Sequence, residues 1–140
     1  MKNLLFVMLL TTTISLNAQV KKEEPFKTLF SNMGISATHS VEQYKDGSIH
    51  IMFQNLEYKT ISDIEMLKIG DDVESAILCY QEMLNVLSSE NGTYTLTNGI
   101  EVYKGVSGIV IRSGNEPTDG WTIINKMQCK KGIKKLPKYK

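Results

Sequence analysis

The fold of this chain is decided by a helical stretch at residues 71–92, which reads DDVESAILCYQEMLNVLSSENG. Its apolar residues recur every three or four positions and predict one apolar helical face, made up of Val73, Ala76, Ile77, Tyr80, Met83, Leu84 and Leu87. Asp71 and Glu74 have the spacing of a capping box and predict the helix start, and Asn91-Gly92 predicts its end. We therefore expect a long helix that buries one face against the rest of the chain.

A hairpin is expected before this helix. Apolar residues alternate at 35–41 and again at 49–53, on either side of Asp46-Gly47-Ser48. A three-residue loop places all of these apolar side chains on one face, whereas a two-residue loop turns Val41 away from the others. Because a slip of one residue exchanges the faces of a strand, the hydrophobic pattern favours the three-residue loop.

Further strands are expected on both sides of the central helix. Residues 58–61 have strand composition, and residues 64–69 fit either a strand or a short helix, of which the strand is preferred. After the helix, Asn98-Gly99 is a strong hairpin signal, and residues 109–111 and 121–124 continue in strand composition.

A helix is expected at each end of the domain. The first begins at Pro25 and has apolar residues at helical spacing, namely Phe26, Leu29, Phe30 and Met33. The last begins with a capping box of Asn125 and Gln128 and buries Cys129, Ile133 and Leu136. The order of elements predicts an α+β fold, in which a mostly antiparallel meander sheet carries a central helix and N- and C-terminal helices packed on it.

Residues 1–18 have the pattern of a cleavable secretory signal peptide. Lys2 gives a positive start, an apolar run covers residues 4–10, and Ala18 is a small residue at the expected cut. The run is shorter than the about 20 apolar residues of a membrane-spanning helix, and no second long run follows, so no transmembrane segment is expected. We expect a single domain at residues 19–140, exported to the periplasm or secreted.

Charge is distributed unevenly along the expected domain. Residues 126–140 contain seven lysines and no acidic residue, whereas residues 19–125 contain eight basic and fifteen acidic residues. One interpretation is that the lysines form a solvent-exposed helix face near the negative end of the helix dipole. The alternative is that they contact an anionic partner, with Lys130 and Lys134 as candidates. The tail has no arginine and one aromatic residue, so it lacks base-reading and stacking groups. No nucleic-acid partner is expected.

Cys79 and Cys129 are the only cysteines. In an oxidising compartment they are candidates for a disulfide, because Cys129 is expected to face inward and Cys79 lies at the edge of the apolar stripe of its helix. The alternative is a pair of buried thiols that pack as small apolar groups. No CxxC motif and no Cys/His cluster at zinc spacing is present.

Catalytic and cofactor motifs do not stand out. In the favoured hairpin register, His39 faces inward opposite Asn55 and His50 faces outward opposite Tyr44, so the two cannot share a metal ion. Residues 105–108, Gly-Val-Ser-Gly, fall one residue short of a nucleophile elbow. No catalytic residue, metal site or cofactor is assigned, although a lone histidine remains a candidate acid-base group.

The remaining candidate is a polar loop at residues 113–120 that leads into Trp121, the only tryptophan. Loops on a rigid scaffold often carry binding residues, and tryptophan is common at binding hot spots. The alternative, which is favoured, is that Trp121 begins a strand and packs in the core. If the loop binds a partner, its contact residues are Asn115, Glu116, Asp119 and Trp121.

Three functions are compatible with these features. The first is a non-enzymatic binding module outside the cytoplasm, which acts as an inhibitor, a protective partner or a ligand binder and contacts another protein or an envelope component. The second is a small periplasmic hydrolase that uses His39 or His50 with a carboxylate. The third is an envelope-surface protein that docks its basic C-terminal helix on anionic lipid.

Overall fold

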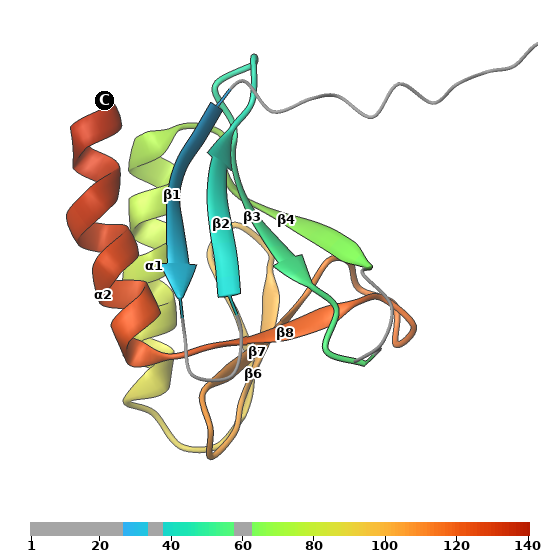
Figure 1. Ribbon diagram of the computed structural model, residues 1–140. Helices are drawn as coiled ribbons and strands as arrows, with labels where there is room; N and C mark the ends of the chain where they lie inside the picture. Colours follow the sequence, from blue (N-terminus) through green and yellow to red (C-terminus); the bar gives the residue numbers. More distant parts are fainter. Residues whose placement is uncertain (1–26, 34–37, 58–62) are drawn as a thin grey trace, which may run out of the picture.

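The computed structural model describes residues 27–33, 38–57 and 63–140, which form two antiparallel sheets and two α-helices (Figure 1). The first sheet has four strands in chain order, and each pairs with the next. They are β1 (Lys27–Met33), β2 (Thr38–Gln43), β3 (Ile49–Gln54) and β4 (Ile64–Gly70). Residues 64–69 are therefore a strand, as preferred from the sequence. The predicted strand at 58–61 and the predicted signal peptide lie outside the described residues.

The second sheet repeats the same meander with four shorter strands. They are β5 (Gly92–Thr95), β6 (Glu101–Lys104), β7 (Ile109–Arg112) and β8 (Trp121–Ile124). The predicted hairpin at Asn98-Gly99 joins β5 to β6, and Gly99 has a φ of 84°, a conformation that glycine adopts without strain.

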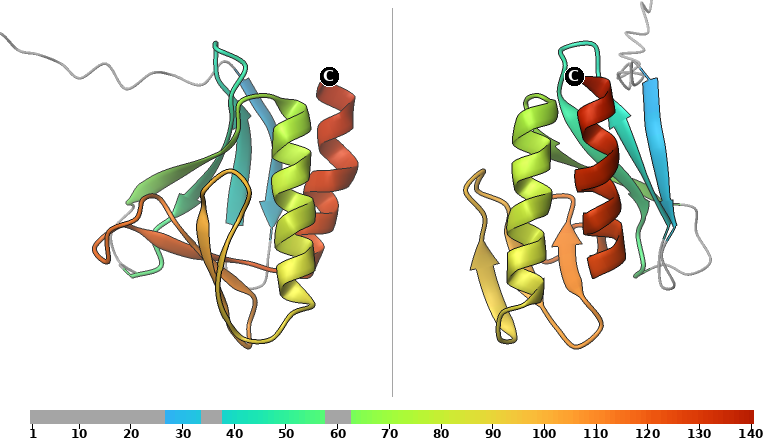
Figure 2. Two further views of the ribbon diagram at one scale, coloured as in Figure 1. Left: turned by 180° about the vertical axis from the view of Figure 1, so that it is seen from behind. Right: turned by 90° about the vertical axis from the view of Figure 1, so that its left-hand side faces the viewer.

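Two helices complete the fold, α1 (Val73–Leu87) and α2 (Lys126–Lys135), and a short 3₁₀ helix, η1 (Leu136–Tyr139), continues α2. The two α-helices run side by side in opposite directions (Figure 2). They pack on the inner side of the strands, where α1 contacts β4 and β7 and α2 contacts β1. This arrangement confirms the predicted α+β class, although the strands form two sheets rather than one.

Both helix starts are capped, one of them a residue later than predicted. The N-cap of α1 is Asp72, whose carboxylate accepts from the Ser75 backbone N–H at 2.8 Å, so the predicted pairing of Asp71 with Glu74 is wrong. The helix ends at Leu87, before the predicted stop at residues 91–92. The capping box of Asn125 and Gln128 at the start of α2 is confirmed.

The predicted N-terminal helix is wrong over residues 27–33, which form strand β1. Leu29 and Phe30 are both buried although they are neighbours, because the register shifts between Thr28 and Phe30. Such a bulge breaks the strict alternation of a strand, so the apolar spacing imitates that of a helix. Asn32 is buried as well and donates from Nδ2 to the Gln128 carbonyl on α2 at 2.9 Å.

The outer edge of β1 is covered by side chains from the C-terminal helices. The Tyr139 hydroxyl donates to the Leu29 carbonyl at 2.6 Å, and Lys131 Nζ donates to the Ser31 carbonyl at 2.7 Å. Both carbonyls belong to β1, which lies at the edge of the first sheet. A strand edge left with unpaired backbone groups invites pairing with other chains, and here α2 and η1 prevent this.

The β2–β3 hairpin has the predicted faces and a three-residue loop, but the loop lies one residue earlier than predicted. Gln43 pairs with Ile49, and the Tyr44 N–H donates to the Ser48 carbonyl at 2.9 Å, so the loop covers residues 45–47 rather than 46–48. His39 consequently lies opposite Phe53 and not Asn55. Because the register differs by an even number of residues, His39 still faces inward and His50 outward, as predicted.

One continuous apolar core lies between the helices and the two sheets. Cys79 and Cys129 both belong to it and are free thiols, so the candidate disulfide is absent and the alternative of two buried thiols holds. Among the described residues, none of the helices combines the length and the apolar character that spanning a membrane requires.

Candidate functional site

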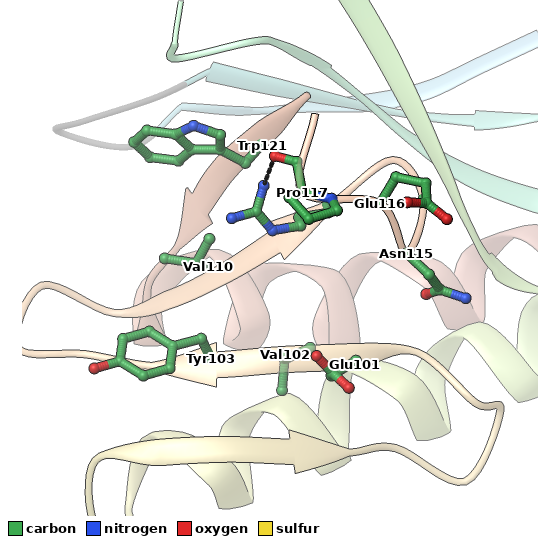
Figure 3. Close-up of a pocket in the computed structure, with 10 residues that line it drawn as sticks. Glu101, Val102, Tyr103, Val110, Asn115, Glu116, Pro117 and Trp121 are labelled. Atoms are coloured by element: carbon green, nitrogen blue, oxygen red, sulfur yellow. Dashed lines mark hydrogen bonds between the residues drawn. The ribbon is translucent and has the colours of Figure 1, made fainter. Parts of the chain in front are cut away.

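A row of side chains on the outer face of the second sheet forms one wall of a cavity. Val102, Ile109, Ile111 and Ile124 are buried inward, so the residues that alternate with them point away from the helices. These outward residues include Tyr103 on β6, Val110 on β7 and Trp121 on β8. Figure 3 shows the three side chains arranged across neighbouring strands.

The backbone register fixes this row. Tyr103 pairs directly with Val110, and Trp121 pairs with Arg112, two residues further along β7. Trp121 is thus the diagonal neighbour of Val110, a separation that aromatic side chains bridge. Tyr103 is 51% exposed, which leaves one face of its ring open to a ligand.

The loop at residues 113–120 forms the opposite wall and is held by internal hydrogen bonds. Ser113 N–H donates to the Gly120 carbonyl at 2.9 Å and extends the β7–β8 ladder by one pair. Asp119 accepts the Glu116 N–H on Oδ2 at 2.7 Å and returns its own N–H to the Glu116 carbonyl at 3.0 Å. The loop therefore has a defined shape that positions Asn115 and Glu116.

Arg112 ties the same loop to the sheet. Its Nη1 donates to the carbonyls of Pro117 and Asp119, each at 3.3 Å, and Figure 3 shows the first of these bonds as a dashed line. A guanidinium carries five donors in a fixed planar arrangement, so one nitrogen can hold the loop while others stay available.

The cavity between these walls measures about 560 Å³. Besides Arg112, its polar side chains come from two elements: Glu101 on β6, and Asn115 and Glu116 in the loop. Within the described part of the chain, none of these side-chain groups has a hydrogen-bond or ion-pair partner. Together with the Tyr103 hydroxyl they form a set of donors and acceptors that a ligand can use.

The residues predicted from the sequence divide into three groups. Asn115, Glu116 and Trp121 line the cavity. Asp119 lies in the same loop and braces it from within. Lys130 and Lys134 lie on α2, outside the cavity, and both are exposed. Trp121 begins its strand as expected, but it is half-buried on the outer face, and Thr122 and Ile124 are the residues of β8 that face the core.

Sequence reasoning missed the part of the cavity wall that lies on the neighbouring strands. Glu101, Tyr103, Val110 and Arg112 alternate with buried residues on β6 and β7. The alternation is visible in the sequence, because apolar Val102 separates Glu101 from Tyr103. The sequence does not reveal the register of the β6–β7 and β7–β8 strand pairs, which brings these residues beside Trp121.

Neither histidine lines this cavity. His39 is 1% exposed, and its Nε2 and Nδ1 lie 3.0 Å from Thr122 Oγ1 and 3.2 Å from Gln128 Nε2. Burial lowers the pKa of His39 to about 4. His50 lies on the outer face of the first sheet, with its ring 4.3 Å from that of Tyr44. In residues 27–33, 38–57 and 63–140, no group of three or more His, Cys, Asp or Glu side chains is arranged to hold a metal ion.

Comparisons of the chain with protein-family models, with curated proteins and with solved structures find no match.

Proposed function

We propose that this chain is a non-enzymatic binding module that acts outside the cytoplasm and holds its ligand in the cavity on the outer face of the β5–β8 sheet. The observation that carries the proposal is the set of side-chain donors and acceptors without partners, gathered beside Tyr103, Val110 and Trp121. Binding sites typically combine an apolar surface with a few polar groups that fix the ligand's orientation. Export rests on the signal-peptide pattern of residues 1–18.

The braced loop supports a binding role. The hydrogen bonds of Asp119 and Arg112 hold the loop before any ligand arrives. A preformed site loses less conformational entropy on binding than a flexible one. The hydrolase alternative gains no support, because both ring nitrogens of His39 have partners in the interior and His50 packs beside Tyr44.

The proposal is tested through the fluorescence of Trp121, which is the only tryptophan and lines the cavity. The protein is titrated with a lysine peptide, a glutamate peptide, a neutral peptide and maltohexaose. We expect saturable changes in fluorescence with at least one probe, and weaker binding of that probe to Tyr103→Ala. The matched control is Leu78→Ala, which removes another exposed apolar side chain, on α1. Unchanged fluorescence with all four probes contradicts the proposal.

A second candidate function is supported by the exposed lysines of α2. Lys126, Lys130 and Lys134 are spaced four residues apart on this helix, and residues 126–140 contain no acidic side chain. Residues at this spacing lie on one helix face. Such a row suits an anionic lipid surface, to which each basic residue adds about 1 kcal/mol.

The lipid candidate is tested by sedimentation with vesicles that contain phosphatidylglycerol, against vesicles of phosphatidylcholine alone. Lys130→Gln together with Lys134→Gln is expected to reduce binding to the anionic vesicles. Lys45→Gln with Lys104→Gln is the control, because these lysines lie on the β2–β3 turn and on β6. Equal binding by both double variants contradicts a role for the α2 row.

A further inference from the structure

The cavity on the outer face of the second sheet has an excess of acidic groups around it. Glu101 and Glu116 line it from two different elements. Asp119 supports the loop, and Glu65 of β4 packs so closely on Gly120 that a Cβ there would lie 2.4 Å from the Glu65 Cγ. The only basic residue in the lining is Arg112, so the two carboxylates outnumber the single guanidinium and the lining keeps a formal charge of −1. A cationic ligand would therefore meet a complementary charge.

Among the described residues, the lysines of β6 and α2 leave this excess in place. Lys104, the basic residue of β6, directs Nζ to the Gly105 carbonyl at 2.6 Å and to Asn91 Oδ1 at 3.4 Å. The row on α2 belongs to the helical layer, which covers the inner side of the strands, whereas the cavity opens on their outer side (Figures 1 and 3). The acidic cavity and the basic helix thus occupy opposite sides of the second sheet.

The apolar wall of the cavity adds a second requirement for the ligand. Trp121, Val110 and Tyr103 offer two aromatic rings and a branched aliphatic group side by side (Figure 3). Aromatic faces attract cations and also pack against the methylene groups that carry them. A ligand that satisfies both walls has an aliphatic stem that ends in a positive charge.

We infer, on the basis of the proposed function, that the ligand of this cavity is a basic peptide segment whose lysine or arginine side chain packs on Trp121, Val110 and Tyr103 and directs its charge to Glu101 and Glu116. The row from Tyr103 to Trp121 crosses three neighbouring strands, which is about 10 Å at a strand spacing of about 4.8 Å. About three residues of extended peptide span that distance. The cavity of about 560 Å³ has room for such a segment.

The experiment uses a capped five-residue peptide with two lysines as the probe, and Trp121 fluorescence as the readout. Its comparison probes are the same peptide with two glutamates, spermidine and maltohexaose. We expect saturable binding of the lysine peptide that weakens as salt is added. Replacing both Glu101 and Glu116 by Gln should weaken it by about tenfold, as expected for two partly exposed charge pairs.

The matched control is Glu90→Gln, because Glu90 is an exposed carboxylate after α1 that does not line the cavity. It should change the affinity by less than about twofold. Urea unfolding of each variant checks that the fold is intact.

Each of the other results overturns the inference in a distinct way. If the Glu101/Glu116 variant binds the lysine peptide as well as the wild type does, the cation binds elsewhere. If spermidine binds as tightly as the peptide, the site takes a free amine. Binding of maltohexaose or of the glutamate peptide in place of the lysine peptide refutes the cationic ligand but leaves the binding module standing. If no probe changes the fluorescence of Trp121, the inference and the proposed function both fail.

Discussion

His39 of β2 and Thr122 of β8 join the two sheets in the interior, with 3.0 Å between Nε2 and Oγ1. The tautomer of the imidazole follows from its neighbours. Gln128 accepts the Asn125 N–H on Oε1, which turns its Nε2 amide toward His39 Nδ1 at 3.2 Å. Because Nδ1 accepts this bond, the proton resides on Nε2 and is donated to Thr122. The same Gln128 Nε2 also donates to the Asn32 carbonyl, so the network reaches β1.

The buried His39 makes stability depend on pH. Desolvation lowers its pKa to about 4 in the folded protein, against 6.5 for an unperturbed histidine. Well above pH 6.5 His39 is neutral in both the folded and the unfolded protein, so its titration does not change the free energy of unfolding. As the pH falls from 6.5 to 4, only the unfolded chain takes up the proton, so the free energy of unfolding should fall by about 3 kcal/mol.

This prediction is measured by urea unfolding at several pH values between 4 and 7. His39→Gln removes the titrating group, so its stability should fall less over the same range than that of the wild type. Carboxylates whose pKa is lowered, such as Asp46 and Asp72, contribute at the acidic end in both proteins and cancel in the comparison. Parallel curves for the two proteins would contradict a neutral buried His39.

The sequence predicted best those elements whose signals are local. The start of α2 and the bounds of β8 were predicted to the residue, because a capping box and a polar loop mark them within a few positions. The faces of the β2–β3 hairpin and the length of its loop were predicted although the loop lies one residue earlier, since the faces depend only on whether the register is odd or even.

Non-local features were the ones that sequence reasoning missed. The bulge at residues 28–30 gives β1 an apolar spacing like that of a helix, so the sequence predicted a helix there. The pairing of β1 with β2 and its contacts to α2 show that it is a strand. Trp121 was assigned to the core in preference to the surface, since nothing near it in the sequence tells which side of β8 meets the helices. Tyr103 and Glu101 were missed for the same reason.

Gly132 allows the two helices to approach closely. A Cβ at this position would lie 2.5 Å from Tyr80 Cε2, and the Tyr80 ring is only 1% exposed, so it has little room to move. Overpacking of this kind lowers the free energy of unfolding by about 1–3 kcal/mol, whereas the higher helix propensity of alanine raises it by about 1 kcal/mol. Three atoms of the Tyr80 ring lie within 2.8 Å of that Cβ, which places the cost in the upper part of this range, so Gly132→Ala should lower the free energy of unfolding by about 1–2 kcal/mol.

Chemical denaturation measures this change, with Gly105→Ala as the control. A Cβ on Gly105 has its nearest contact at 3.5 Å, from the Tyr103 ring, which is ordinary packing. A Gly132→Ala protein as stable as the wild type would show that the helices are not in close contact at Gly132.

Tyr139 fastens the C-terminal end of the chain to the first sheet. Tyr139→Phe removes the hydrogen bond from its hydroxyl to the Leu29 carbonyl and should lower the free energy of unfolding by about 1 kcal/mol. Tyr103→Phe is the matched control, because the Tyr103 hydroxyl has no partner within the described residues. Equal stability of the two variants in urea would refute the role of Tyr139 at the edge of β1.

Cys79 and Cys129 should be nearly inert toward thiol reagents in the folded protein. Burial raises the pKa of each thiol to about 12, so very little of the reactive thiolate exists at pH 8. We expect Ellman's reagent to modify both cysteines quickly in guanidinium and only slowly in native buffer. Fast modification of the native protein, or a mass two hydrogens below that of the dithiol form, would contradict two buried free thiols.

Asp119 is expected to act on the cavity through the shape of its loop. Asp119→Ala removes the acceptor of the Glu116 N–H, so hydrogen exchange at that amide should become faster while the protein keeps its overall stability to within about 0.5 kcal/mol. A more mobile loop should also weaken binding of any ligand that contacts Asn115 or Glu116, because the loop then loses conformational entropy when the ligand binds. Asp63→Ala is the control, since Asp63 precedes β4 and its Oδ2 contacts Asn55 rather than the loop. If exchange at Glu116 is unchanged in Asp119→Ala, the Asp119 carboxylate does not hold the loop, which contradicts this prediction.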